Sequence, residues 1–301
     1  MVWVKICGIT NIKDADQISA MGADAIGFIF SSLSKRKINF ADAEEIIHFL
    51  RNKYELNSYS VRRNGNYNCR NKNYNNNYNN YNNYDNCDGK MPAIVGVFVN
   101  EEIDVVIENT VLLNLDFVQF SGDEDVNYLN KFKQKIKEKL QSFNKNYINI
   151  NDNLNNKNNN LNYNNLNYRS LINMENNLVR LIKLIRINTR EANYSSKDIK
   201  NKLIKEISKF KDLVDYFLLD TYKDNVYGGT GETFSWETIH DFGKYLPVIL
   251  AGGLSPENVK EAINIVKPFG VDASSKLEVE PGKKDIKKVS EFIKNAKSDL
   301  I

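Results

Sequence analysis

The chain has 301 residues, of which 42% are hydrophobic, and its 41 basic and 38 acidic side chains leave a formal net charge of +3. This near balance gives no electrostatic basis for binding nucleic acid or an anionic membrane. No apolar run approaches the ~18 residues of a membrane-spanning helix, and the first residues carry no secretory signal. The 3 cysteines lack paired spacing, which indicates a reducing, cytoplasmic compartment, and 2 histidines exclude a histidine-rich metal site. We expect neither a metal nor a cofactor.

Asparagine is concentrated in two tracts. Residues 52–88 hold 15 Asn in 37, and residues 141–177 hold 17 Asn in 37. Such polar sequence offers too little apolar area to offset the entropy of ordering it, whereas a folded domain tolerates long surface insertions. We therefore predict one domain, residues 1–301, that is interrupted twice. A role of these Asn/Tyr-rich tracts in contacting partners is the alternative.

Short apolar runs alternate with amphipathic stretches along the rest of the chain. Strands are predicted at 2–6, 25–30, 94–99, 116–120, 181–187, 214–219, 247–251 and 270–272. Helices are predicted at 12–21, 41–51, 101–110, 125–140, 198–211, 235–243, 255–266 and 284–297. Thr10 or Asn11 is a cap for the first helix, which ends before Gly22. Ser255 is the expected cap of the seventh, with Pro256 at its first position.

Eight strand–helix pairs in the remaining ~230 residues predict an α/β fold, a single (β/α)8 barrel. An open, doubly wound sheet is the competing architecture, but the turn after the first strand, residues 7–10, lacks the Gly-x-Gly-x-x-Gly pattern. In the barrel, the first tract falls between the second helix and the third strand. The second tract falls between the fourth helix and the fifth strand. Both connections lie on the face opposite the active site of such barrels.

Two strand ends carry candidate catalytic groups. Alternation along the first strand places Trp3, Lys5 and Cys7 on one side, and the other side is aliphatic, so Lys5 and Cys7 should point into the barrel. Cys7 would then lie at the catalytic mouth, although a cysteine at a strand end is also a common small core residue. Asp220 closes the sixth strand in the same way, as a functional carboxylate or as a capping group.

Glycines and hydroxyl groups follow the last strands. Gly252 and Gly253 come after the seventh strand, and Ser274 and Ser275 after the eighth. Loops in these positions of a barrel often bind phosphate through backbone N–H groups and hydroxyls. Arg36, in the loop after the second strand, is either a carboxylate ligand or part of a solvated basic cluster.

Together these segments resemble the phosphoribosylanthranilate isomerase family of tryptophan biosynthesis. The matching stretches are 5–10, 27–30, 34–36, 95–98, 219–220, 228–231 with 234 and 236, 250–254 with 256–259, and 270–275 with 281, 282 and 285. They occur in the family's order over the whole barrel, without the two Asn tracts. The resemblance implies an Amadori rearrangement of N-(5-phosphoribosyl)anthranilate, with a phosphosugar as substrate and a monomer or homodimer as the acting species.

The resemblance also implies residue roles. Cys7 becomes the general base and Asp220 the general acid. The implied substrate contacts are Arg36 to the anthranilate carboxylate, Gln119 and Asp272 beside the substrate, and Gly252, Gly253, Ser274 and Ser275 to the phosphate. Gly228, Gly229, Thr230 and Gly231 would form a mobile loop. As a hypothesis, Lys5 favours the thiolate of Cys7, and a dry environment favours the protonated form of Asp220.

Three positions depart from the family pattern. Ser121 replaces the family's histidine after the fourth strand, Lys276 replaces the glycine of Ser-Ser-Gly, and Lys35 replaces a proline before Arg36. Lys276 would crowd the phosphate turn if its φ were positive. These departures favour the alternative of a catalytically degenerate, phosphate-binding barrel that acts as an interaction protein. A third interpretation is another barrel enzyme that acts on a phosphosugar. Such an enzyme would have no reason to carry the sequence Lys-Ile-Cys-Gly-Ile-Thr on its first strand.

Overall fold

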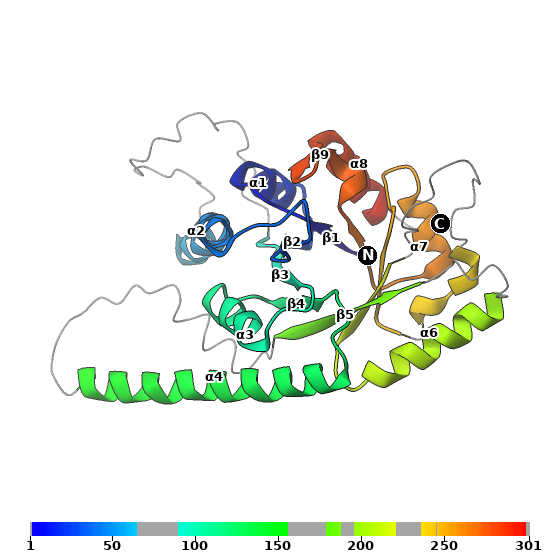
Figure 1. Cartoon of the computed structure of the whole chain (residues 1–301). Coiled ribbons are helices and arrows are strands. Elements are labelled where there is room, and N and C mark those ends of the chain that lie inside the picture. The colour runs from blue at the N-terminus through cyan, green and yellow to red at the C-terminus, as the bar shows by residue number, and fades with distance from the viewer. Residues whose placement is uncertain are drawn as a thin grey trace.

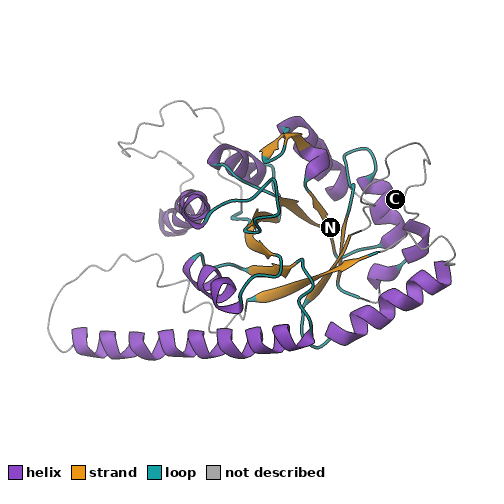
Figure 2. Cartoon of the chain, viewed as in Figure 1, coloured by secondary structure: helices purple, strands orange, loops and turns teal. Residues whose placement is uncertain are grey.

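Eight parallel strands close into one barrel in this computed structural model, which describes residues 2–64, 90–155, 179–187, 196–220, 236–244 and 246–298 (Figures 1 and 2). The strands pair in chain order and β8 returns to β1, so the predicted (β/α)8 barrel is confirmed. The strands are β1 (Trp3–Cys7), β2 (Ala25–Ile29), β3 (Ala93–Phe98), β4 (Phe117–Phe120), β5 (Arg180–Arg186), β6 (Tyr216–Asp220), β7 (Val248–Ala251) and β8 (Gly270–Ala273).

Helices surround the strands (Figure 2). The α-helices are α1 (Ile12–Ala20), α2 (Phe40–Asn64), α3 (Ile103–Leu112), α4 (Val126–Asn155), α6 (Ser196–Phe210), α7 (Val259–Val266) and α8 (Ile286–Lys297). Short 3-10 helices are η1 (Trp236–Ile239), η2 (Phe242–Lys244) and η3 (Ser275–Leu277), and β9 (Glu278–Glu280) pairs with β10 (Lys283–Lys284). Within the described residues, no helix combines the length and the apolar character needed to cross a membrane.

The core has two parts because successive side chains of a strand point to opposite faces. One large cluster joins the outer faces of the strands to the helices and includes Val4 and Ile6. A smaller cluster fills the barrel itself and includes Cys7. The predicted alternation along β1 is therefore confirmed.

Aromatic rings close the amino-terminal end of the barrel. The ring of Trp3 lies 5.7 Å from that of Phe117 and 6.0 Å from that of Phe269. Tyr216 contacts Phe269 at 4.6 Å. The barrel interior at this end is therefore a packed core, and barrels of this class carry their active sites at the carboxyl ends of the strands.

Four helix predictions differ from the structure. The helices predicted at 41–51 and 125–140 continue as α2 to Asn64 and as α4 to Asn155, and α4 extends well past the barrel (Figure 1). No Gly or Pro follows residue 51 until Gly65, and none follows residue 140 until Gly228. Asn disfavours a helix by only about 0.7 kcal/mol per residue, so nothing stops either helix early. The tracts fall between α2 and β3 and between α4 and β5. Their residues 65–88 and 156–177 lie outside the described residues.

The other two corrections concern the carboxyl-terminal half. The helix predicted at 235–243 is described as η1 and η2, and α7 begins at Val259 instead of Ser255. Asn258 causes the late start of α7. Its Oδ1 accepts the N–H of Ser255 at 2.8 Å and its Nδ2 donates to the Gly253 carbonyl at 3.1 Å, which holds residues 255–258 in a turn. By contrast, Asn11 caps α1 as predicted, with Oδ1 accepting the N–H of Asp14 at 2.8 Å.

Candidate active site

Cys7 ends β1 and points into the barrel mouth. Lys5, two residues earlier on the same face, donates from Nζ to Oδ2 of Asp272 on β8 at 2.9 Å, and the lysine side chain is 0% exposed. Gly27 on β2 makes room for the thiol, because a Cβ at that position would lie 2.8 Å from Sγ of Cys7. Three strands thus hold a thiol, an ammonium and a carboxylate together. The predicted positions of Lys5 and Cys7 are confirmed.

The charge balance around the thiol differs from the sequence-based hypothesis. Burial raises the pKa of the Cys7 thiol, and the ammonium of Lys5 opposes this shift without overcoming it. Burial alone would lower the pKa of Lys5, but Asp272 and the thiol outweigh it, so the pKa of Lys5 lies above its usual range. Lys5 therefore acts in the expected direction, yet burial makes the neutral thiol the favoured form.

Asp220 ends β6 and shares its face with Tyr216 and Leu218, which belong to the barrel interior. Its carboxylate therefore points to the same mouth as Cys7, because the carboxyl ends of parallel strands meet at one rim. Its register partners are Arg186 on β5 and Ala251 on β7.

Arg186 is a mouth residue that the sequence analysis missed. It closes β5 just as Asp220 closes β6, and Nη2 donates to the Ser121 carbonyl at 2.8 Å. Its side chain is 60% exposed. The signal that could have identified it is its position, because a charged residue on the inner face at the end of a strand follows the same rule that selected Asp220.

Gln119 lies on the inner face of β4. Its Nε2 donates to Oγ of Ser121 at 2.9 Å. Its Oε1 is buried without a hydrogen bond among the described residues, and the same holds for Oδ1 of Asp272. Buried acceptors are normally satisfied, so these two oxygens are unusual for a protein interior.

A buried ion pair fixes the loop that carries Ser121. Nζ of Lys183 lies 2.9 Å from Oε2 of Glu124, with side-chain exposures of 5% and 1%. Glu124 also accepts the N–H groups of Asn100 and Gly122. The loops after β3 and β4 are thereby tied to β5, which holds Gln119 and Ser121 in place.

The predicted phosphate loops follow β7 and β8, and β8 is the strand that pairs with β1. Gly252 and Gly253 have φ angles of 94° and 68°, a left-handed conformation that favours glycine. Ser274 donates from Oγ to the Cys7 carbonyl at 2.9 Å, and η3 begins at Ser275. Lys276 lies within η3 and its φ is not positive, so its Cβ causes none of the backbone strain considered above.

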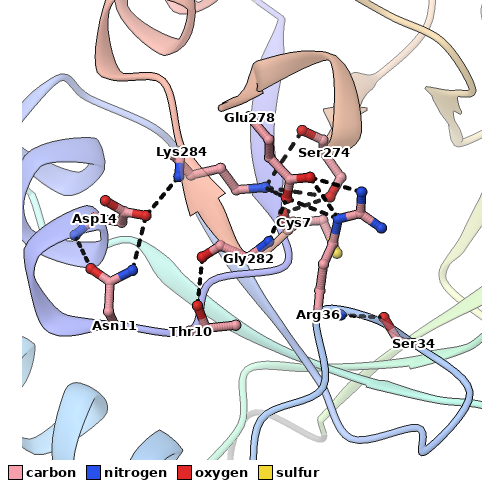
Figure 3. Close-up of polar contacts among 10 residues, drawn as sticks. All are labelled: Cys7, Thr10, Asn11, Asp14, Ser34, Arg36, Ser274, Glu278, Gly282 and Lys284. Atoms are coloured by element: carbon pink, nitrogen blue, oxygen red, sulfur yellow. Dashed lines mark hydrogen bonds and ion pairs between the residues drawn. The ribbon is translucent and has the colours of Figure 1, made fainter. Parts of the chain in front are cut away.

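Arg36 occupies the same side of the mouth, where it pairs with Glu278 (Figure 3). Nε lies 2.8 Å and 2.9 Å from the two carboxylate oxygens, and Nη2 lies 2.7 Å from Oε2. Lys284 donates from Nζ to Oε1 of the same carboxylate at 2.7 Å. Sequence reasoning missed Glu278 and Lys284. The loop predicted to be mobile, residues 228–231, lies outside the described residues, and no cluster of three or more His, Cys, Asp or Glu suited to a metal occurs in the described part of the chain.

Comparison with known proteins identifies the family. Residues 71–161 and 175–295 match the profile described as N-(5'phosphoribosyl)anthranilate (PRA) isomerase. A relative from Petrotoga mobilis with that enzyme name is 33% identical and covers 97% of this chain and 96% of its own length. The phosphoribosyl anthranilate isomerase from Thermotoga maritima is 30% identical with a TM-score of 0.60, each chain being 99% covered.

A further solved structure is an isomerase in complex with reduced 1-(o-carboxyphenylamino)-1-deoxyribulose 5-phosphate. It is 27% identical with a TM-score of 0.57 and 99% coverage of both chains. The profile covers the chain from residue 71 onward, whereas the relative and the two structures cover almost the whole chain. The chain belongs to the N-(5'-phosphoribosyl)anthranilate isomerase family.

Proposed function

We propose that this protein converts N-(5'-phosphoribosyl)anthranilate to 1-(o-carboxyphenylamino)-1-deoxyribulose 5-phosphate in tryptophan biosynthesis. The observation that carries the proposal is the position of Cys7 and Asp220, both on the inner face at the carboxyl ends of their strands, in a chain similar to this family over almost its whole length. Active sites of (β/α)8 barrels are built at this rim.

The reaction needs one acid and one base. Asp220 gives a proton to the ribose ring oxygen, the C1′–O bond breaks, and an imine forms. Cys7, as the thiolate, removes the C2′ proton, and the resulting enolamine tautomerises to the ketone. C1′ is reduced as C2′ is oxidised, so the step consumes no external oxidant or reductant.

The surrounding residues divide the recognition of the substrate. Arg36 would bind the anthranilate carboxylate, and the free oxygens of Gln119 and Asp272 would accept hydrogen bonds from the sugar or its amine. The phosphate would lie against Gly252, Gly253, Ser274 and Ser275. The net charge of Lys5 and Asp272 is zero, so the pair adds polarity under the thiol without repelling an anionic substrate.

The decay of substrate fluorescence tests the proposal. Cys7→Ala and Asp220→Asn should each lower turnover by about 100-fold or more, because a positioned acid or base contributes roughly that much. Asp104→Asn is the matched control, since this carboxylate lies on α3 and its side chain is 79% exposed. Full activity in both site variants would refute the assigned roles. No turnover by the parent protein would refute the function and favour a degenerate phosphate-binding barrel.

We further propose that the protein acts in the cytoplasm as a monomer or homodimer, on a small phosphosugar, without a cofactor, nucleic acid or membrane. The formal charge of +3 supports the absence of a polyanion partner. Sedimentation velocity at micromolar concentration distinguishes the two oligomeric states. Binding to a DNA duplex at low salt would contradict this part of the proposal.

A further inference from the structure

Arg36 uses only one edge of its guanidinium within the protein. Nε and Nη2 form a bidentate pair with Glu278, whereas Nη1 makes no hydrogen bond in the part of the chain that the structure describes. The side chain is 23% exposed. A guanidinium can hold one carboxylate on each of two edges. The Nη1–Nη2 edge is therefore oriented and available for a second carboxylate.

Glu278 is held from its other side by Lys284. The side chains of Glu278 and Lys284 are 4% and 0% exposed, and their charged atoms lie 2.7 Å apart. Lys284 also approaches Oγ of Ser274 at 3.4 Å, and its backbone N–H donates to Oδ2 of Asp14 at 2.8 Å. Burial would raise the pKa of Glu278, but the hydrogen bonds from Arg36 and Lys284 outweigh it and lower the pKa. Glu278 is thus a buried anion between two cations.

The charge count explains why two cations are present. Glu278 alone would neutralise Arg36 and remove its attraction for a substrate anion. With Lys284 included, the three groups sum to +1, so the cluster fixes the arginine and still carries a positive charge for a carboxylate. A buried carboxylate with a single partner would anchor Arg36 but weaken the site.

The backbone at Gly8, the residue after Cys7, forms the remaining packing contact of Arg36. Gly8 has a φ of 77°, and a Cβ there would lie 2.7 Å from Cδ of Arg36 and 3.1 Å from Oγ of Ser274. The arginine stem therefore packs directly over the residue that follows Cys7. Figure 3 shows Arg36, Glu278, Lys284 and Ser274 converging beside Cys7.

We propose that Glu278 and Lys284 are positioning residues, which hold Arg36 with its free edge toward the mouth so that the anthranilate carboxylate is bound in one orientation beside Cys7. This inference rests on the proposed function. It predicts that loss of the anchor weakens binding of the carboxylate and leaves the chemistry of Cys7 and Asp220 largely intact.

The test compares variants in which the net charge of the cluster is controlled. Glu278→Gln should raise KM for phosphoribosylanthranilate about tenfold and change kcat less than about threefold. The reason is that Arg36, which binds the substrate carboxylate, loses a charged hydrogen-bond partner that holds it in place. The double variant Glu278→Gln with Lys284→Met keeps the net charge at +1 and leaves no unpaired buried ammonium. It should fold, and it should show the same rise in KM. An unchanged KM in this variant would overturn the proposal.

A double-mutant cycle shows whether Glu278 acts through Arg36. In an Arg36→Ala background, Glu278→Gln should change KM less than about twofold, since no guanidinium remains to be positioned. Equal effects in both backgrounds would assign Glu278 a merely structural role and refute the inference. Glu280→Gln is the control on β9, because Glu280 is 65% exposed and lies 3.6 Å from Lys283. Its KM should equal that of the parent.

A binding assay separates this inference from the proposed function. Anthranilate is fluorescent, and its titration requires no turnover. It should bind the parent protein about fivefold or more tightly than either Glu278 variant, whereas aniline, which lacks the carboxylate, should show no difference. An inactive parent that still shows this pattern would refute the isomerase activity alone. An active parent whose variants bind anthranilate equally well would refute the positioning role alone.

Discussion

Among the described residues, Lys5 is the cation that bonds Asp272 directly, and replacing it with methionine removes that charge. The two charged atoms lie 2.9 Å apart, and the side chains are 0% and 10% exposed. Methionine retains the length and apolar contacts of the lysine stem, so the main loss is the charge. Breaking a buried pair by removing one partner costs about 3–5 kcal/mol, because the other charge is left without compensation.

The structure places the expected loss at the lower end of this range. Lys284 also lowers the pKa of Asp272, which shows that a second cation offsets part of the carboxylate's desolvation after Lys5 is gone. We therefore expect Lys5→Met to lower the free energy of unfolding by about 3 kcal/mol near pH 8. Lys135→Met is the matched control, because Lys135 lies 2.8 Å from Asp104 with side-chain exposures of 48% and 79%. Its effect should stay below about 1 kcal/mol.

The loss should depend on pH, and the sign follows from Asp272. Its folded-state pKa already lies above the usual value because burial outweighs Lys5 and Lys284, and removing Lys5 raises it further. A carboxyl group with a raised pKa binds its proton more tightly when folded, so the variant regains stability as pH falls toward the unfolded value of about 3.9. Urea unfolding followed by tryptophan fluorescence at pH 5 and pH 8 measures both quantities. A loss equal to that of the control at pH 8, with no recovery at pH 5, would refute the charged pair.

Three further predictions concern the mouth. Because burial raises the pKa of Cys7, kcat/KM should still be rising with pH at about 8.5, the usual pKa of a thiol. A kcat/KM that is already constant below pH 8 would contradict a buried thiol as the base. Gly27→Ala places a Cβ 2.8 Å from the sulfur of Cys7, so it should cost about 1–3 kcal/mol in urea unfolding and lower kcat; a silent substitution would show that the thiol has space. Gly8→Ala would place an alanine at a φ of 77° with its Cβ 2.7 Å from Cδ of Arg36, so it should lower the free energy of unfolding by about 1–3 kcal/mol and raise KM. A KM equal to that of the parent would show that Arg36 is not packed against Gly8.

The strand ends of the site could be predicted from sequence because they follow a local rule. Alternation along β1 fixed the direction of Lys5 and Cys7, and the same rule placed Asp220 inside the mouth. The ends of the helices could not be predicted as accurately as the ends of the strands. In the Asn tracts, a helix that continues and an insertion without regular structure have the same composition. No Gly or Pro precedes Gly65 in the first tract, and the second tract contains neither residue, so no signal marks where either helix ends.

Ion pairs between residues far apart in the sequence could not be predicted from local sequence patterns. Arg36 and Glu278 are 242 positions apart and meet only because β8 returns to β1 in the closed barrel. The same closure brings Asp272 to Lys5. The net shift of the thiol pKa could not be predicted for a related reason, although Lys5 does favour the thiolate as expected. The sequence shows the cation two residues from Cys7, but the degree of burial, which outweighs that cation, depends on every strand around it.

Two of the three departures from the family pattern, Ser121 and Lys276, fall on supporting positions. Ser121, in place of a histidine, accepts a hydrogen bond from Nε2 of Gln119, and Oε1 of Gln119 is buried without a hydrogen bond among the described residues. Lys276, in place of a glycine, is exposed and lies in a 3-10 helix that any residue can adopt. Neither change alters the strands that carry Cys7 and Asp220. In the proposed function, the substitutions therefore bear on how tightly the substrate is held, as Arg36 and its buried anchor do, and they leave the proposed acid and the proposed base in place.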